Sequence, residues 1–182
     1  IEISQETIDI HAPIARRLGL NSIKIELENI AFETLNPHRS KVIKQHLKKQ
    51  FGNFKKNISH VQSEIIQRLS DEGVSGALVE GRQKEPYSLY RKMRYKHLKL
   101  SEVFDLFAFR VIVKDVTECY RTLGIIHNLY KPLPGKFKDY IALPKANGYQ
   151  SLHTVLFGPK KMFVEIQIRS KDMHFISEYG IA

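Results

Sequence analysis

The sequence predicts an α/β (α+β) fold preceded by a helical segment. Two observations support this prediction. As far as residue 73, apolar residues recur every three or four positions, which is the period of a helix. From residue 74 onward, short runs of β-branched and aromatic residues alternate with helical patterns, as in a sheet flanked by helices. We therefore expect a helical connector at 1–73 and a mixed domain at 74–182.

Within the connector, Gly19 is expected to end a first helix and Asn21 to cap a second. Asn36-Pro37 has the form of a cap followed by a first-turn proline, and predicts a long third helix that ends near Gly73. Lysines lie between its apolar positions, so we expect a basic face in solvent rather than a binding surface. The apolar positions are Ile23, Leu27, Ile30 and Ala31 in the second helix, and Ile43, Leu47, Phe51, Phe54, Ile58, Val61, Ile65 and Leu69 in the third.

The mixed domain divides into strands and helices by the same reasoning. β-branched and aromatic runs indicate strands, and periodic segments indicate helices. The expected strands are 75–81, 103–113, 149–157 and 162–169, and the expected helices are 86–97, 117–130 and 170–182.

Composition narrows the possible classes of protein. The apolar fraction of 42% is enough for a packed core, and the single cysteine, Cys119, excludes a disulfide framework and fits a reducing cytosol. No apolar run approaches a membrane span, and no signal peptide opens the sequence. We expect a fragment of a longer, cytoplasmic protein. The net charge of +10 favours an anionic partner, although a solvated basic face explains the charge equally well.

The last predicted strand is the most informative segment, because side chains alternate between the two faces of a strand. One face carries Met162, Val164, Ile166 and Ile168, and the other carries Phe163, Glu165, Gln167 and Arg169. Polar groups in register on one sheet face require solvent, partners or a ligand. A solvated face is the plainer interpretation of this strand alone.

The preceding strand and its approach suggest a ligand. Tyr149, Ser151 and His153 are expected to share a face, and the segment from Lys136 to Lys145 interleaves lysines with aromatic residues. Lysines and aromatic rings together suit a phosphate attached to a flat base.

Two further segments carry charges suited to phosphates and metals. Asp105 opens a strand, where a carboxylate is a natural ligand for a hard metal ion. Strict alternation places Asp105 and Arg110 on opposite faces, and only a bulge or an earlier strand start would bring them together. Arg82 and Lys84 precede the helix at Pro86, whose N-terminus favours anions. The spacing is neither that of a P-loop nor that of a dinucleotide-binding fingerprint.

Taken in order, these segments resemble the RelA/SpoT alarmone synthetases over about residues 75–182. The resemblance also extends to the helical connector of long members, through Ala12-Pro13-Ile14-Ala15-x-Arg17-Leu18-Gly19. The motifs are Gly81-Arg82-x-Lys84, Tyr87 to Met93, Phe104-Asp105, Phe109-Arg110-Val111, Lys138 to Thr154, Val164 to Arg169, and Met173 to Ala182.

The resemblance implies a nucleotidyltransferase-like mixed sheet flanked by helices. It also implies Mg²⁺-dependent transfer of pyrophosphate from ATP to the 3′-hydroxyl of GDP or GTP, which releases AMP. Asp105 and Glu165 would be the catalytic residues and would hold Mg²⁺, and Glu165 would also be a candidate base. The residues expected to bind ATP are Arg82, Lys84, Ser88, Lys92 and Arg110, and those expected to bind the guanosine nucleotide are Lys138, Lys145, Asn147, Tyr149, His153 and Gln167.

The resemblance further implies a longer parent with an N-terminal hydrolase domain and a C-terminal regulatory region, and contact with the ribosome or regulatory proteins through that parent. Lys136-x-Lys138-Asp139 resembles the basic variant of the bifunctional, SpoT-like branch. No His-Asp dipeptide occurs here, so hydrolase activity is not expected from this segment. Two alternatives remain open. One is a related pyrophosphokinase that acts on the tRNA 3′ end, and the other is a non-catalytic module that binds RNA or a protein partner.

Overall fold

The computed structural model describes residues 1–100, 107–159 and 163–179, except for the side chains at 50, 51, 53, 54, 83 and 107. In this part of the chain five strands form one mixed sheet in the order β1-β2-β5-β4-β3. The central pair β2–β5 is parallel, and the other pairs are antiparallel. The strands are β1 (Leu78–Gln83), β2 (Phe107–Val113), β3 (Lys138–Asp139), β4 (Leu152–Phe157) and β5 (Phe163–Ser170).

The helices largely follow the predicted ranges. The first predicted helix is a run of α1, the π-helical η1 and α2, and α4 is the long third helix. The bounds are α1 (Glu2–Glu6), η1 (Thr7–His11), α2 (Ala12–Arg17), α3 (Asn21–Leu35), α4 (Pro37–Asp71), α5 (Pro86–Lys96), α6 (Val116–Leu129) and α7 (Lys171–Tyr179). No helix among the described residues is both long and apolar enough to cross a bilayer.

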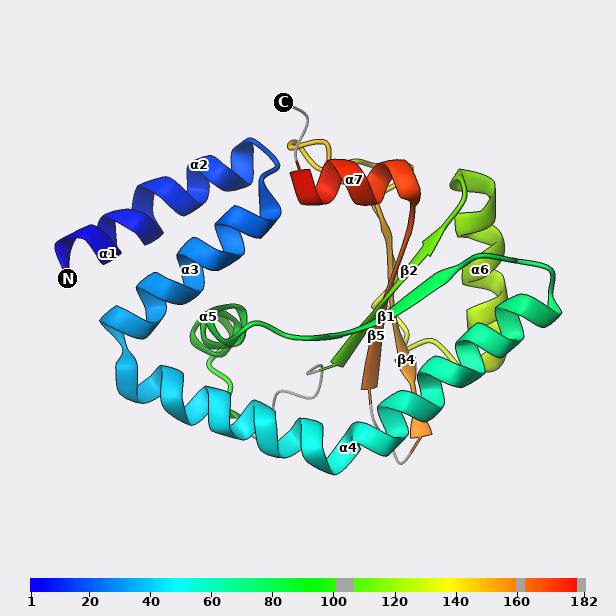
Figure 1. The fold of residues 1–182 in the computed structure, drawn as a ribbon, viewed down its shortest axis with the longest axis horizontal. Coiled ribbons are helices and arrows are strands. Elements are labelled where there is room, and N and C mark those ends of the chain that lie inside the picture. Colours follow the sequence, from blue (N-terminus) through cyan, green and yellow to red (C-terminus); the bar gives the residue numbers. More distant parts are fainter. Residues whose placement is uncertain (101–106, 160–162, 180–182) are drawn as a thin grey trace.

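The two faces of the sheet differ in chemistry, as the alternation in the last strand predicts. Val164, Ile166 and Ile168 of β5 are buried in the main core on one face. Helices α4 and α6 cover this face, and Ile58 of α4 comes within 3.8 Å of where a Cβ on Gly81 would lie. In Figure 1 the sheet is seen nearly edge-on, with α6 on one side and α3 and α5 on the other.

The N-terminal helices join the same core. Phe32 of α3 is fully buried and stacks on Tyr90 of α5, with their ring centroids 4.7 Å apart. Buried residues of α4, such as Ile43 and Leu47, belong to the cluster that contains Phe109 of β2. The core therefore spans position 73, and the predicted domain boundary there stays a prediction.

Two details of the helix predictions are wrong. Ile23 and Ile30 of α3 are 48% and 59% exposed; Ala31 is buried as predicted, and α3 also buries Glu28 and Phe32, which lie outside the predicted stripe. Asn21 is the first helical residue rather than the cap, because Leu20 occupies the cap position. The second cap, Asn36, is correctly placed before α4 but makes no side-chain capping hydrogen bond.

Candidate functional site

The polar face of the sheet forms one wall of a cleft of about 800 Å³, and the N-terminal helices form the opposite wall. A cleft of this size suits a small-molecule ligand. Among the described residues that line it, eight are Lys or Arg and three are Glu, so the cleft attracts anions. These charged residues are Arg16, Arg17, Lys24, Arg82, Lys84, Arg91, Lys145, Arg169, Glu28, Glu85 and Glu165.

Most of the expected site residues reach this cleft. The β5 strand contributes Glu165 and Gln167, the β1–α5 segment contributes three further residues, and the loop before β4 contributes the rest. The expected residues that line the cleft are Arg82, Lys84, Ser88, Lys145, Asn147, Tyr149, Glu165 and Gln167. Lys92, Arg110, Lys138 and His153 are not among the lining residues. Asp105 lies outside the described residues, and so does its relation to Arg110.

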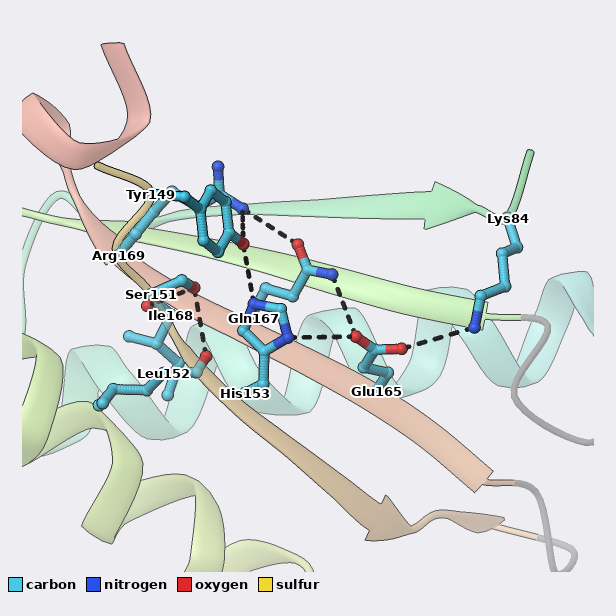
Figure 2. Close-up of polar contacts among 9 residues, drawn as sticks. All are labelled: Lys84, Tyr149, Ser151, Leu152, His153, Glu165, Gln167, Ile168 and Arg169. Carbon is cyan, nitrogen blue, oxygen red and sulfur yellow. Dashed lines mark hydrogen bonds and ion pairs between the residues drawn. The ribbon is translucent and has the colours of Figure 1, made fainter. Parts of the chain in front are cut away.

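Glu165 is the acidic centre of the sheet wall, with a side chain that is 19% exposed. Its Oε2 lies 3.7 Å from the Nζ of Lys84, and its Oε1 accepts a hydrogen bond of 3.1 Å from the amide of Gln167 (Figure 2). Glu165 is in register with Ala108 of β2, whose small side chain also lines the cleft. The carboxylate is therefore held among donors and stays accessible from the cleft.

Tyr149 lines the cleft, and its ring and its hydroxyl both contact other residues of the site. Gly148, at φ +73°, makes the turn that precedes it, in a backbone region that favours glycine. The Nζ of Lys145 lies 4.5 Å from the ring centroids of both Tyr140 and Tyr149, so this ammonium group makes cation–π contacts with two rings. Burial, together with nearby cations led by Arg16, lowers the pKa of Lys145.

His153 lies behind the lining residues. Its Nε2 is 2.8 Å from the Tyr149 hydroxyl, and its Nδ1 is 3.6 Å from Oε1 of Glu165. Burial lowers the pKa of His153 to about 4, against the opposing effect of the Glu165 charge. The imidazole is therefore neutral near pH 7, and its contact with Glu165 is not an ion pair.

Arg110 is engaged away from the cleft. Its Nη2 lies 2.9 Å from Glu178 of α7, and its Nη1 lies 3.8 Å from Glu80, its register neighbour on β1. The side chain is 12% exposed. Arg110 shares the polar sheet face with Gln167, its register neighbour on β5, and in this arrangement its charge is matched by two carboxylates.

Arg169 is the main cleft residue that sequence reasoning did not assign to the site. It is 1% exposed, and its Nη2 donates to the Tyr149 hydroxyl at 3.1 Å and to Oε1 of Gln167 at 3.0 Å. Its Nη1 donates to the hydroxyl of Ser177 on α7. The only signal in the sequence is its place on the same strand face as Glu165 and Gln167.

The connector was also not expected to line a site. Arg16, Arg17 and Lys24 nevertheless contribute to the wall, and the amide of Asn147 donates to the carbonyl of Arg16 at 3.1 Å. Lys24 itself pairs with Glu28 at 3.0 Å. The hydrogen bond from Asn147 therefore ties the loop before β4 to the N-terminal helices.

The described residues contain no group of three or more His, Cys, Asp or Glu side chains that could enclose a metal ion. Among the described residues, Glu165 is the carboxylate that the sheet contributes to the cleft lining, and Lys84 flanks it. Mg²⁺ is commonly bound by one or two carboxylates together with substrate phosphates, rather than by a cage of protein ligands. The donor set around Glu165 fits that mode of binding.

The fold is that of alarmone synthetases. The chain resembles the small alarmone synthetase 1 from Bacillus subtilis bound to its product pppGpp, with a TM-score of 0.59 and 24% sequence identity over 72% of this chain and 76% of that one. The small alarmone synthetase 2 from the same organism also has a TM-score of 0.59, and covers 70% of this chain and 74% of its own.

Residues 81–182 match the family described as "Region found in RelA / SpoT proteins", and the chain belongs to this family. Over 99% of its length it is 51% identical to the bifunctional (p)ppGpp synthase/hydrolase SpoT of Escherichia coli K12. It is 43% identical, again over 99% of its length, to a GTP pyrophosphokinase of Myxococcus xanthus. The chain spans 26% and 24% of the lengths of these two relatives.

Proposed function

We propose that this chain transfers pyrophosphate from ATP to the 3′-hydroxyl of GDP or GTP and releases AMP. The observation that carries the proposal is the Glu165 carboxylate on the sheet wall of a cleft whose charged lining residues are mostly cations and which includes residues of the synthetase motifs. Two nucleotides bring many negative charges together, so catalysis requires positioning and charge neutralisation. Family membership and the fold of the alarmone synthetases support the same reaction.

The reaction forms one bond and breaks one. The 3′-oxygen attacks the β-phosphorus of ATP, and the bond from that phosphorus to the oxygen bridging the α- and β-phosphates breaks. AMP leaves with the bridging oxygen, and the hydroxyl proton needs an acceptor close to the attacking oxygen. Glu165 is the candidate acceptor, because it is the carboxylate at the centre of the sheet wall.

The cleft offers separate groups for the two substrates. Arg82, Lys84 and Ser88, next to the N-terminus of α5, would hold the ATP phosphates, where backbone N–H groups add to the attraction. The loop before β4 contributes Lys145, Asn147 and Tyr149 to the cleft. These residues would bind the guanosine nucleotide, with the Tyr149 ring stacking on the base.

Four of the residues expected to bind substrate do not line the cleft. Three of them would have to move to reach a nucleotide, and the fourth would act through its neighbours. Arg110 would have to leave Glu178 to reach ATP, and Lys92 and Lys138 would have to reach inward. His153 acts on Tyr149 and Glu165 from behind them.

Glu165, together with Asp105, would hold Mg²⁺, which would supply positive charge to offset the charge that develops on the phosphates. We further propose that the chain is part of a longer bifunctional protein, because its relative SpoT is described as a synthase/hydrolase. We also propose that this protein works in the cytoplasm, because the single cysteine, Cys119, fits a reducing cytosol. Hydrolase activity and contacts with the ribosome or regulatory proteins would then belong to other parts of that protein.

An acceptor assay tests the proposal. The purified chain is incubated with ATP and Mg²⁺, and with GDP, GTP or uncharged tRNA as the acceptor, and the nucleotides are separated. We expect AMP to form in step with ppGpp or pppGpp. Product on the tRNA 3′ end alone would assign the chain to the tRNA-modifying relatives, and RNA binding without any transfer would favour a non-catalytic module. Glu165→Gln is the matched control, since it removes the charge and keeps the shape.

A further inference from the structure

Five polar side chains, four that line the cleft and His153 behind them, form a closed ring of contacts. Arg169 lies at one end and Glu165 at the other, and two arms join them (Figure 2). One arm passes through Tyr149 and His153, and the other passes through Gln167. The two arms meet on the same oxygen, Oε1 of Glu165.

The direction of the first arm is set at both of its ends. A guanidinium only donates hydrogen bonds, so the Tyr149 hydroxyl accepts from Nη2 of Arg169 at 3.1 Å. The hydroxyl hydrogen is then free to point to Nε2 of His153 at 2.8 Å. A carboxylate only accepts, so Glu165 favours a hydrogen on Nδ1 of His153, 3.6 Å away. Both ends select the Nδ1–H tautomer.

The direction of the second arm is fixed in the same way. Oε1 of Gln167 accepts the other hydrogen of the Arg169 Nη2 at 3.0 Å. The amide nitrogen of Gln167 is therefore turned toward Oε1 of Glu165, to which it donates at 3.1 Å. Arg169 therefore supports, from the far end of each arm, the same orientation of the amide and the imidazole that Glu165 favours.

Arg169 is itself held firmly in place. It is 1% exposed, its Nη1 donates to Ser177 on α7, and its guanidinium carbon lies 5.3 Å from the centroid of the Tyr149 ring. A buried side chain with several fixed donors can orient its neighbours at little entropic cost during the reaction.

We propose that Arg169 is the positioning residue for Glu165, because its hydrogen bonds to Tyr149 and Gln167 set the direction of the contacts in both arms. Both arms present N–H groups to Oε1, which leaves Oε2, on the side of Lys84, for the substrate hydroxyl or the metal ion. The catalytic consequence rests on the proposed function, whereas the orientation of the ring of contacts does not. Arg169 touches no reacting atom in this arrangement and acts on turnover through Glu165.

The tautomer of His153 gives a test that does not depend on activity. In the chain labelled with ¹⁵N and ¹³C histidine, the His153 signals are assigned by their loss in His153→Gln. We expect the Nδ1–H form in the wild-type chain. Tyr149→Phe removes the donor to Nε2 and should shift the population toward Nε2–H, whereas Gln167→Leu cuts only the other arm and should leave the tautomer unchanged. A wild-type chain in the Nε2–H form would overturn the proposal.

Kinetics test the consequence for catalysis. We expect Arg169→Gln to lower kcat by roughly 10- to 100-fold, as for other partners that orient a reactive ligand, while KM for each nucleotide changes by less than about threefold. Arg169→Lys should retain more activity, because an ammonium can still donate to one arm. A loss confined to KM, or unchanged kcat, would overturn the proposal.

The outcomes distinguish a positioning role of Arg169 from a purely structural one, and the failure of this proposal from the failure of the proposed function. If the Arg169 variants do not fold, Tyr149→Phe and Gln167→Leu each cut one arm and carry the kinetic test instead. A purely structural role would lower kcat only in proportion to the folded fraction, which thermal melting measures. A wild-type chain that makes no product but holds His153 as Nδ1–H would contradict the proposed function and still support the positioning.

Discussion

Replacing Tyr149 separates two roles that its ring and its hydroxyl can play. The ring lines the cleft beside Lys145 and would stack on guanine, whereas the hydroxyl joins Arg169 to His153. Tyr149→Ala removes both parts, and Tyr149→Phe removes only the hydroxyl. Comparison of the two variants therefore isolates the contribution of the ring.

The expected magnitudes follow from these contacts. Loss of base stacking costs about 1–3 kcal/mol, which corresponds to a rise of roughly 5- to 150-fold in the apparent KM for GDP in Tyr149→Ala. Tyr149→Phe should keep KM for GDP within about twofold of the wild type, because it keeps the ring. Both variants leave buried partners of the hydroxyl unsatisfied, at a cost of about 1–3 kcal/mol. Each kcal/mol lowers Tm by about 2–4 °C in a chain of this size.

The assay titrates GDP at saturating ATP and then ATP at saturating GDP, for the wild type and both variants. A rise in KM for GDP alone, seen in the Ala variant and not in the Phe variant, is the predicted result. A lowered Tm does not discriminate between the roles, because the hydrogen bonds of the hydroxyl predict it in both variants. Equal rises in KM for ATP and GDP in the Ala variant would refute the stacking role and leave Tyr149 as a structural residue.

Three further outcomes are expected. Glu165→Gln should abolish turnover while Tm and the circular dichroism spectrum stay close to the wild type; residual turnover above a few per cent would argue against Glu165 as base or metal ligand. Gly52 lies in α4, and no atom that the structure describes lies within 4 Å of an added Cβ there, so Gly52→Ala should stabilise the chain by about 0.5–1 kcal/mol in urea unfolding. Gly73 has φ +76°, so Gly73→Ala should destabilise the chain by about 1 kcal/mol. A destabilising Gly52→Ala together with a stabilising Gly73→Ala would refute this reasoning. Burial raises the pKa of the Cys119 thiol from its usual 9.0 to about 12, so its contribution to stability should be lost as the pH rises from about 9 toward 12, and a thiol reagent at pH 8 should react only on unfolding.

The alternation of the last strand was predictable because its pattern is local. Val164, Ile166 and Ile168 alternate with polar residues, and burial of one face follows directly from the pleat. The same alternation brought Glu165 and Gln167 to one face, where the structure has them. The long helix α4 was equally predictable from the sequence, because the helical spacing of its apolar residues persists from Pro37 to Asp71.

The misplaced stripe of α3 shows where local patterns fail. The helix buries Glu28 and exposes Ile23 and Ile30. Glu28 tolerates burial because Lys24 and Arg91 lie 3.0 Å and 3.6 Å from its carboxylate. Since Arg91 belongs to α5, only the tertiary arrangement reveals this pairing, and apolar periodicity alone wrongly placed Ile23 and Ile30 in the core although it placed Ala31 there correctly.

Sequence reasoning missed Arg169, and the residues of the N-terminal helices that line the cleft, for the same reason. The importance of Arg169 depends on Tyr149, which precedes another strand, and on Ser177, which belongs to the following helix. The position of Arg16 in the cleft depends on the packing of residues more than a hundred positions apart in the sequence, as its contact with Asn147 shows. Strand alternation gave the face of Arg169, and the fold supplied its partners.

Position-specific labelling of ATP tests the central claim most directly. Parallel reactions of the purified chain with GDP and Mg²⁺ use ATP labelled at either the α- or the γ-phosphate. Because the β- and γ-phosphates would move together, we predict that the γ label migrates with ppGpp while the α label remains in AMP. Release of the γ label as free phosphate, with the α label in ADP, would contradict pyrophosphate transfer.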